Sequence, residues 1–272
     1  MPRVSDVDEI RRTLALYSRF NDEKDSAAWS ELWTENGAVT DRSGTYVGRA
    51  AIKRFVDGIN EKNPDRDTLH FCANPLITLD GDTARAYTDI VFVSRPTNPL
   101  GPWVLGNVNH YTDRLVRSGS RWLFEDRRID RRPLIHPSLA DLHLSPPADQ
   151  EEAIRRALAL YAQLLDNKDS TGWSEQFALH GTFHTTNGDH TGRQAIKQPM
   201  ERQIANAPSD HHTAHFGANA VITLDGDSAQ VTGDWLTLES VGEQPWSVLR
   251  VSRTSDRLVR EDGAWRFTWK EE

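Results

Sequence analysis

The sequence predicts an α+β protein built from two tandem copies of one unit. Three observations lead to this fold class: a repeat at a nearly constant offset, amphipathic helix patterns at the start of each copy, and strand patterns after them. The clearest part of the repeat pairs IRRTLALY (10–17) with IRRALALY (154–161), which lies 144 positions later. Seven matches in eight positions at such a distance indicate a duplicated unit.

The repeat continues along nearly the whole chain. Its offset changes only from 144 to 145 and then to 143, as expected when loops between fixed elements gain or lose a residue. We therefore predict a first domain at 1–131, a proline-rich linker at 132–149 and a second domain at 150–272. The other matching blocks are YVGRAAIK (46–53) with HTGRQAIK (190–197), LHFCANPLITLDGDTA (69–84) with AHFGANAVITLDGDSA (214–229), and TDRLV (112–116) with SDRLV (255–259).

Composition limits the classes of function. The chain has 272 residues, 37% of them hydrophobic, which is enough for two domains with separate cores. A net charge of −8 argues against nucleic acid as a partner, and the short basic cluster DRRIDRR (126–132) is expected to be a strand end and solvated linker. No apolar run approaches the ~20 residues of a membrane span, and no signal peptide is recognisable, so a cytoplasmic protein is expected. The single cysteine, Cys72, is expected to be a small buried residue.

Each copy is expected to begin with helices. Ile10, Leu14 and Tyr17 recur at three-to-four spacing and predict a first helix with one apolar face. WSELWTENG (29–37) indicates a second short helix that ends near Gly37, and 51–62 indicates a third. The following β-branched and aromatic segments, with Asp-Gly and Ser-Gly turns, predict antiparallel strands. Each copy is therefore expected to pack its helices on one face of a curved antiparallel sheet.

The motifs of both copies resemble the nuclear transport factor 2-like superfamily, and most closely its SnoaL-like, scytalone dehydratase-related branch. The resemblance is carried by YxxxxDxxD (17–25), by GRxAIK (48–53) and by HxxxNxxIxxDGD (70–82). The first copy is also similar to hexachlorocyclohexane dehydrochlorinase through SGTYVG and TLHFCAN. The resemblance implies that each copy is a cone-shaped α+β barrel. This scaffold hosts dehydratases, isomerases, cyclases, epoxide hydrolases and binding proteins, so the resemblance implies a fold more strongly than a reaction.

The resemblance also implies a set of site residues in each copy. Dehydratases of the family use an Asp–His pair, and members similar to bile-acid 7α-dehydratase add a tyrosine and a second aspartate. The matching positions are Tyr17, Asp22, His70 and Asp89 in the first copy, and Tyr161, Asp166, His215 and Asp234 in the second.

These residue types suit elimination chemistry. A neutral imidazole can remove a proton from carbon, and a carboxylate bonded to its other nitrogen fixes its tautomer. A tyrosine hydroxyl can hold a substrate oxygen, and a carboxyl with a raised pKa can protonate a leaving hydroxide. No metal or organic cofactor is required. Each of these residues also has a purely structural interpretation. The aspartates could be solvated carboxylates, the histidines hydrogen-bonded core residues, and the tyrosines part of the core packing.

The copies differ at positions that could determine specificity. His110 of the first copy stands opposite Arg253 of the second, and Trp103 lies in a proline-rich loop expected to cover the first pocket. His211 and His212 join His215 in the second copy only, but no carboxylate stands at ligand spacing, which argues against a metal site.

The sequence thus favours a cofactor-independent lyase of dehydratase type that acts on a small, partly apolar, oxygenated ring compound. An isomerase or cyclase, and a binding protein without catalysis, remain alternatives. An epoxide hydrolase would require Arg253 to converge with Asp166 and Asp234. Because proteins of this fold commonly pair through their sheets, the two copies are expected to form a pseudo-dimer within one chain, with further oligomerisation left open.

Overall fold

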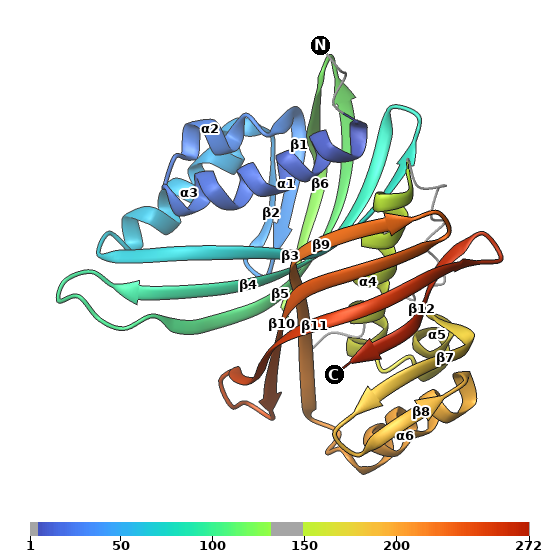
Figure 1. Ribbon diagram of the computed structural model, residues 1–272. Coiled ribbons are helices and arrows are strands. Elements are labelled where there is room, and N and C mark those ends of the chain that lie inside the picture. Colours follow the sequence, from blue (N-terminus) through green and yellow to red (C-terminus); the bar gives the residue numbers. More distant parts are fainter. Residues whose placement is uncertain (1–4, 132–148, 272) are drawn as a thin grey trace. The chain divides into compact units, whose positions relative to one another are not determined.

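The computed structural model describes residues 5–131 and 149–271, which form two compact units with the same order of elements (Figure 1). The predicted linker therefore lies outside the described residues, apart from Asp149. The first unit comprises α1 (Asp6–Asp22), α2 (Ser26–Ser30), β1 (Trp33–Asp41), β2 (Gly44–Val47), α3 (Arg49–Lys62), β3 (Arg66–Asp80), β4 (Thr83–Pro96), β5 (Val104–Ser118) and β6 (Arg121–Arg131). The second comprises α4 (Gln150–Asp166), α5 (Ser170–Glu175), β7 (Phe177–Thr185), β8 (Gly188–Thr191), α6 (Arg193–Asn206), β9 (His211–Asp225), β10 (Ser228–Val241), β11 (Ser247–Glu261) and β12 (Ala264–Glu271).

Each unit contains one curved six-stranded sheet with helices packed against it (Figure 1). The strand orders are β2-β1-β6-β5-β4-β3 and β8-β7-β12-β11-β10-β9, so β3 and β9 lie at an open edge. The α+β class is therefore confirmed, but the sheets are curved rather than closed into barrels. They are not wholly antiparallel either, because β1 pairs with β6 and β7 with β12 in parallel.

The first helix of each unit begins at an N-cap and ends at the aspartate of the sequence motif. The Ser5 hydroxyl accepts a hydrogen bond from the Asp8 amide at 3.2 Å, and the Asp149 carboxylate accepts one from the Glu152 amide at 2.8 Å. Such caps satisfy amide groups that have no partner inside the helix. Lys24, with φ of 57°, turns the chain after α1.

The prediction of a second helix at 29–37 was wrong. The helix covers only Ser26–Ser30, where Asp25 caps it through the Ala28 amide, and β1 begins at Trp33. Gly37 lies within this strand rather than at a helix end. A Cβ there would stand 2.8 Å from Cδ1 of Trp33, so glycine allows the strand to approach the packed indole.

Aromatic side chains form the core between the helices and the sheet in both units. In the first unit, Tyr17, Trp29, Trp33, Trp122 and Phe124 are buried in one cluster with the aliphatic residues of α1 and α3. The second unit repeats this arrangement with Tyr161, Trp173, Phe177, Trp265 and Phe267. Burial of such large side chains supplies most of the hydrophobic stabilisation of each unit. No helix in the described ranges is long and apolar enough to cross a membrane.

Candidate functional site

An Asp–His pair lies at the end of α1 in the first unit. Nδ1 of His70 is 2.6 Å from Oδ1 of Asp22, and the backbone amide of His70 donates to Oδ2 of the same carboxylate at 2.9 Å. The Thr68 hydroxyl donates a further hydrogen bond to Oδ1 at 3.2 Å. The carboxylate is therefore held by β3 through three contacts and stabilises the imidazole in one orientation.

The same pair is present in the second unit. Nδ1 of His215 is 2.5 Å from Oδ1 of Asp166, and its backbone amide donates to Oδ2 at 3.0 Å. In both units the aspartate is the last residue of the first helix, and the histidine lies on the edge strand. The spacing inferred from the sequence thus corresponds to direct contact in both copies.

A groove lies beside the dyad of the first unit. It has a volume of about 710 Å³ and runs between α1 and the edge strand β3. Asp22, His70 and Trp103 all line it, so the structure brings the predicted loop tryptophan to the dyad. The Arg95 guanidinium lies 4.8 Å from the centre of the Trp103 ring, a cation–π contact that holds the indole at the groove. The other lining residues are Ala15, Ser18, Arg19, Glu23, Asp67, Thr68, Leu69, Phe71 and Cys72.

Cys72 differs from the sequence-based expectation because the residue is exposed. It lies on the edge strand β3, and its register partner is Ile90, a member of the core cluster, so its thiol is directed to the helix-covered face. Desolvation at that position raises the pKa of the thiol to about 12. A thiol that keeps its proton at neutral pH is a poor nucleophile.

Tyr17 lies inside the core and does not line the groove. Its side chain is buried, and Cζ of Arg127 lies 3.9 Å from the centre of its ring. Desolvation raises the pKa of Tyr17, partly offset by the charge of Arg127. Tyr161 is similarly buried, with Nζ of Lys270 5.0 Å from its ring centre. Both tyrosines therefore pack against a buried cation.

The buried cations were not recognised in the sequence, where DRRIDRR (126–132) indicated only a strand end and solvated linker. Arg127 is only 1% exposed and donates two hydrogen bonds to Asp113, at 2.6 and 2.7 Å. Lys270 donates to Asp256 at 2.8 Å in the second unit. The signal that could have found them was the repeat itself, because Arg127 and Lys270 occupy matching positions at the offset of 143.

Asp89 and His110 do not join the dyad. Their neighbours Ile90 and Tyr111 belong to the core cluster, so alternation along the strands directs Asp89 and His110 to the opposite face of the sheet. There Nδ1 of His110 lies 3.0 Å from Oδ1 of Asp89, and both residues are buried. The expectation that Asp89 supplies an acid in the pocket is therefore not supported by its position.

Asp234 and Arg253 lie on the corresponding face in the second unit. Nε of Arg253 donates to Oδ1 of Asp234 at 3.0 Å, and the arginine side chain is largely exposed. Trp235, the next residue of β10, packs with the core and with His215 instead. Arg253 and Asp234 thus lie on the face opposite to Trp235 and His215, which does not favour the convergence with Asp166 that epoxide opening would require.

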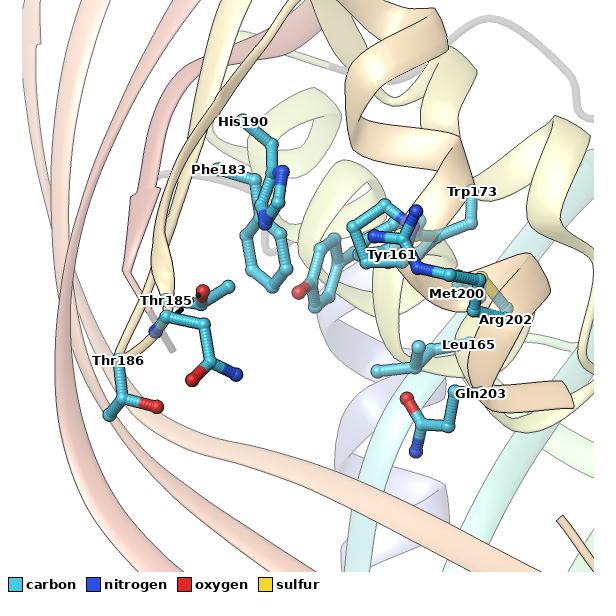
Figure 2. A pocket seen from close by; sticks show the side chains of 12 residues that line it. Tyr161, Leu165, Trp173, Phe183, Thr185, Thr186, His190, Met200, Arg202 and Gln203 are labelled. Atoms are coloured by element: carbon cyan, nitrogen blue, oxygen red, sulfur yellow. Dashed lines mark hydrogen bonds between the residues drawn. The ribbon is translucent and has the colours of Figure 1, made fainter. Parts of the chain in front are cut away.

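The second unit has a cavity in a different place. It measures about 340 Å³ and lies among α4, α6 and the β7–β8 hairpin (Figure 2). Tyr161 lines it, whereas neither Asp166 nor His215 does. Sequence reasoning missed the polar residues around this cavity, although two of them, Arg202 and Gln203, replace Gly58 and Ile59 of the first copy.

The histidine cluster of the second copy is dispersed among different partners. Nε2 of His211 lies 3.3 Å from a carboxylate oxygen of Glu239. Desolvation lowers the pKa of His212, and the charge of Lys168 lowers it further. Among the described residues no group of three or more histidine, cysteine, aspartate or glutamate side chains is arranged to hold a metal ion.

Two tandem units of helices on a curved sheet, each with an Asp–His pair at the end of its first helix, define a duplicated nuclear transport factor 2-like protein. Within that class, the chain belongs to the SnoaL-like domain family, which it matches twice, over residues 2–128 and 146–269. The family resemblance inferred from the motifs is thereby confirmed. No curated protein matches the chain.

Similar solved structures cover about half of the chain each. An NTF2-like protein with a cystatin-like fold from Novosphingobium aromaticivorans is 25% identical and covers 44% of this chain and 79% of its own, with a TM-score of 0.39. ActVI-ORFA from Streptomyces coelicolor is 16% identical, with coverages of 47% and 98% and a TM-score of 0.43. A protein from Catenulispora acidiphila in complex with S-DNPA is 20% identical, with coverages of 46% and 92% and a TM-score of 0.42.

Proposed function

We propose that the chain is a cofactor-independent lyase whose first unit eliminates water from a small, partly apolar, oxygenated ring compound. The observation that carries the proposal is the position of the Asp22–His70 dyad on the wall of the 710 Å³ groove. A general base needs both a fixed orientation and access to a substrate proton. In the first unit the carboxylate provides the orientation, and the groove provides the access.

The reaction requires a carbon acid with a hydroxyl group on the neighbouring carbon. With Nδ1 of His70 bonded to Asp22, Nε2 on the other side of the ring takes the proton from carbon. The electron pair of the broken C–H bond forms the carbon–carbon double bond, and the C–O bond breaks. The departing hydroxide takes the proton back from Nε2 and leaves as water, so the imidazole returns to its neutral form. Asp22 stabilises the imidazolium between these steps.

The surroundings of the groove fit a partly apolar substrate. Leu69, Phe71 and Trp103 supply apolar surface, while Arg19 supplies hydrogen-bond donors. Nonpolar walls with a few polar groups are typical of sites for small organic molecules.

The second unit is assigned a different role because its dyad has different surroundings. The Trp235 ring lies 6.0 Å from the His215 ring, at a position that Ile90 occupies in the first unit. The 340 Å³ cavity among α4, α6 and the β7–β8 hairpin is lined by neither dyad member. Its Asp166–His215 pair is therefore proposed to join α4 to β9 rather than to act as a base.

The test compares matched variants of the two dyads on a panel of cyclic β-hydroxy ketones. Dehydration is followed through the absorbance of the enone product, and proton removal through deuterium incorporation from D₂O. His70→Ala is expected to lower the elimination rate by about 10²–10⁴-fold, the usual contribution of a general base. His215→Ala is the control and is expected to retain the rate.

Three results would contradict the proposal. Equal losses in the two variants would remove the assignment to the first unit. Full activity of His70→Ala would exclude its imidazole as the base. Tight binding of panel compounds without deuterium incorporation or product would favour the alternative of a binding protein.

A further inference from the structure

The cavity of the second unit has an aromatic floor and a polar rim. Tyr161, Trp173, Phe183 and Met200 are buried in its wall. Figure 2 shows the Tyr161 hydroxyl directed into the space that these side chains surround. The remaining lining residues are Leu165, Thr185, Thr186, Asn187, His190, Pro199, Arg202 and Gln203.

The matching place in the first unit holds a groove of about 530 Å³ whose wall includes an aromatic stack, and Tyr17 does not line it. The rings of Tyr46 and Phe55 lie face to face, with centroids 4.2 Å apart and planes at 27°. The Tyr46 hydroxyl also lies 2.8 Å from the Ser43 hydroxyl, which fastens the stack to the hairpin. In the second unit the two ring positions are His190 and Pro199 at the constant offset of 144. Two smaller rings replace the stack, and an opening toward Tyr161 results.

The rim of this opening carries donors at other positions than the matching surface of the first unit, which has Arg54 and Lys62. Arg202 replaces Gly58, Gln203 replaces Ile59, and Asn187 replaces Ser43. Within the part of the chain that the structure describes, Arg202 forms no ion pair. The indole N–H of Trp173, buried in the wall, has no acceptor there either. Unpaired donors beside a buried aromatic floor favour a ligand that presents an anionic oxygen and a flat ring.

We propose that this cavity is a second, separate binding site that takes a small aromatic or alicyclic carboxylate. The ring lies on Tyr161 and Phe183, and the carboxylate lies at the rim, where Arg202 and Gln203 donate to it. A volume of about 340 Å³ is at the lower end of ligand pockets and fits a one- or two-ring acid. The site does not depend on the proposed lyase activity, because neither dyad lines it.

The probe is 1-naphthoate, with 1-naphthamide as its uncharged counterpart, titrated into the full chain and followed by calorimetry and ligand-observed NMR. One naphthoate is expected to bind per chain, more tightly than the amide. Arg202→Gln is expected to weaken naphthoate binding by about tenfold or more and to leave the amide unchanged, because a charge-assisted hydrogen bond is lost. Arg202 is exposed, so the substitution is not expected to disturb folding.

The controls separate this site from the first unit. Arg54→Gln removes the arginine of the matching hairpin–helix surface and is expected to leave naphthoate binding unchanged. His70→Ala is also expected to retain it. The double variant His190→Tyr, Pro199→Phe rebuilds the stack of the first unit and is expected to abolish binding of both probes, with the fold checked by circular dichroism.

Three outcomes would overturn the inference. The first is that naphthoate does not bind at millimolar concentration. The second is that Arg202→Gln binds naphthoate as tightly as the unchanged protein does. The third is that the double variant folds correctly and still binds naphthoate as before. Loss of naphthoate binding in His70→Ala would place the acid in the groove of the first unit instead.

Discussion

Asp22 serves the fold and the proposed chemistry at the same time. Besides orienting His70, its carboxylate accepts hydrogen bonds from the His70 amide and the Thr68 hydroxyl. We expect Asp22→Ala to destabilise the protein by about 1–3 kcal/mol, because a partly buried backbone amide loses its acceptor. His70→Ala keeps its own amide hydrogen-bonded to Asp22 and is expected to cost less. Urea unfolding followed by circular dichroism compares the two, and equal stabilities would contradict a structural role for the carboxylate.

Cys72 gives a pH-dependent prediction. Because its pKa is raised to about 12, only about one thiol in 10⁴ is ionised at pH 8, against roughly one in four for an unperturbed thiol. Because desolvation disfavours the thiolate, we expect iodoacetamide to modify the folded protein at least tenfold more slowly than the urea-unfolded chain. The folded state holds the proton more tightly, so this thiol contributes stability below about pH 8.5 that is lost as pH rises toward 12. Rapid modification of the folded protein at pH 8 would show that the thiol is not desolvated.

The contact of His70 with Asp22 could be predicted from the sequence, whereas the face of the sheet on which Asp89 lies could not. The dyad could be predicted because the motif spacing joins a helix end to an edge strand. The face of Asp89 could not, because a shift of one residue reverses every side chain of a strand. A register shift between Ala73 and Leu76 of β3 changes that alternation on the neighbouring strand. Asn74, with φ of 52°, and Pro75 lie at this bulge, and a proline inside a strand pattern is its local signal.

At the scale of elements, the pair of Asp113 on β5 and Arg127 on β6 connects two central strands. Both side chains are buried, and desolvation raises the pKa of Asp113 against the lowering effect of Arg127. Asp113→Ala would leave a guanidinium buried without its partner, and we expect a loss of about 3–5 kcal/mol. Replacing both residues, as Asp113→Leu with Arg127→Met, is expected to recover most of this loss.

The second unit supplies the matched comparison. Asp256→Ala is expected to cost less than Asp113→Ala, because Lys270 donates one hydrogen bond to Asp256 whereas Arg127 donates two to Asp113. The shift of the urea midpoint measures both costs. A larger loss in the second unit, or a double variant as unstable as Asp113→Ala alone, would contradict the role of the buried charge.

Elements with strong periodicity were predicted well, and the hairpins were not. The apolar stripe of α1 and the turns around β3–β6 are explicit in the sequence. The hairpins β1–β2 and β7–β8 combine short strands with polar residues, and their pairing in parallel with β6 and β12 joins segments far apart in the chain. Whether such short segments form strands depends on tertiary contacts that the local sequence does not show. The local pattern of WTENG therefore indicated the end of a helix, although these residues form a strand.

At the scale of the whole molecule, the duplication was enough to predict the fold class, but it did not predict that the two copies have pockets in different places. Shared motifs predicted two equivalent sites, yet the groove and the cavity occupy different places in their units. The differences arise from a few substitutions, such as Ile90 against Trp235 and Phe55 against Pro199, whose effect depends on packing. The pseudo-dimer expected from pairing through the sheets remains a prediction.

If a few positions determine which unit has the carboxylate site, the site should be transferable to the first unit. We therefore combine Tyr46→His and Phe55→Ala, which remove the aromatic stack, with Gly58→Arg and Ile59→Gln, which supply the donors of the second unit. The stoichiometry of 1-naphthoate is expected to rise from one to two per chain, and each site should prefer the acid to the amide. The pair Tyr46→His, Phe55→Ala alone is the control. It keeps Arg54 and Lys62 but lacks the added donors, so it should prefer the acid less than the four-site variant does. A folded four-site variant that still binds one naphthoate would show that the cavity depends on more of the second unit than these positions.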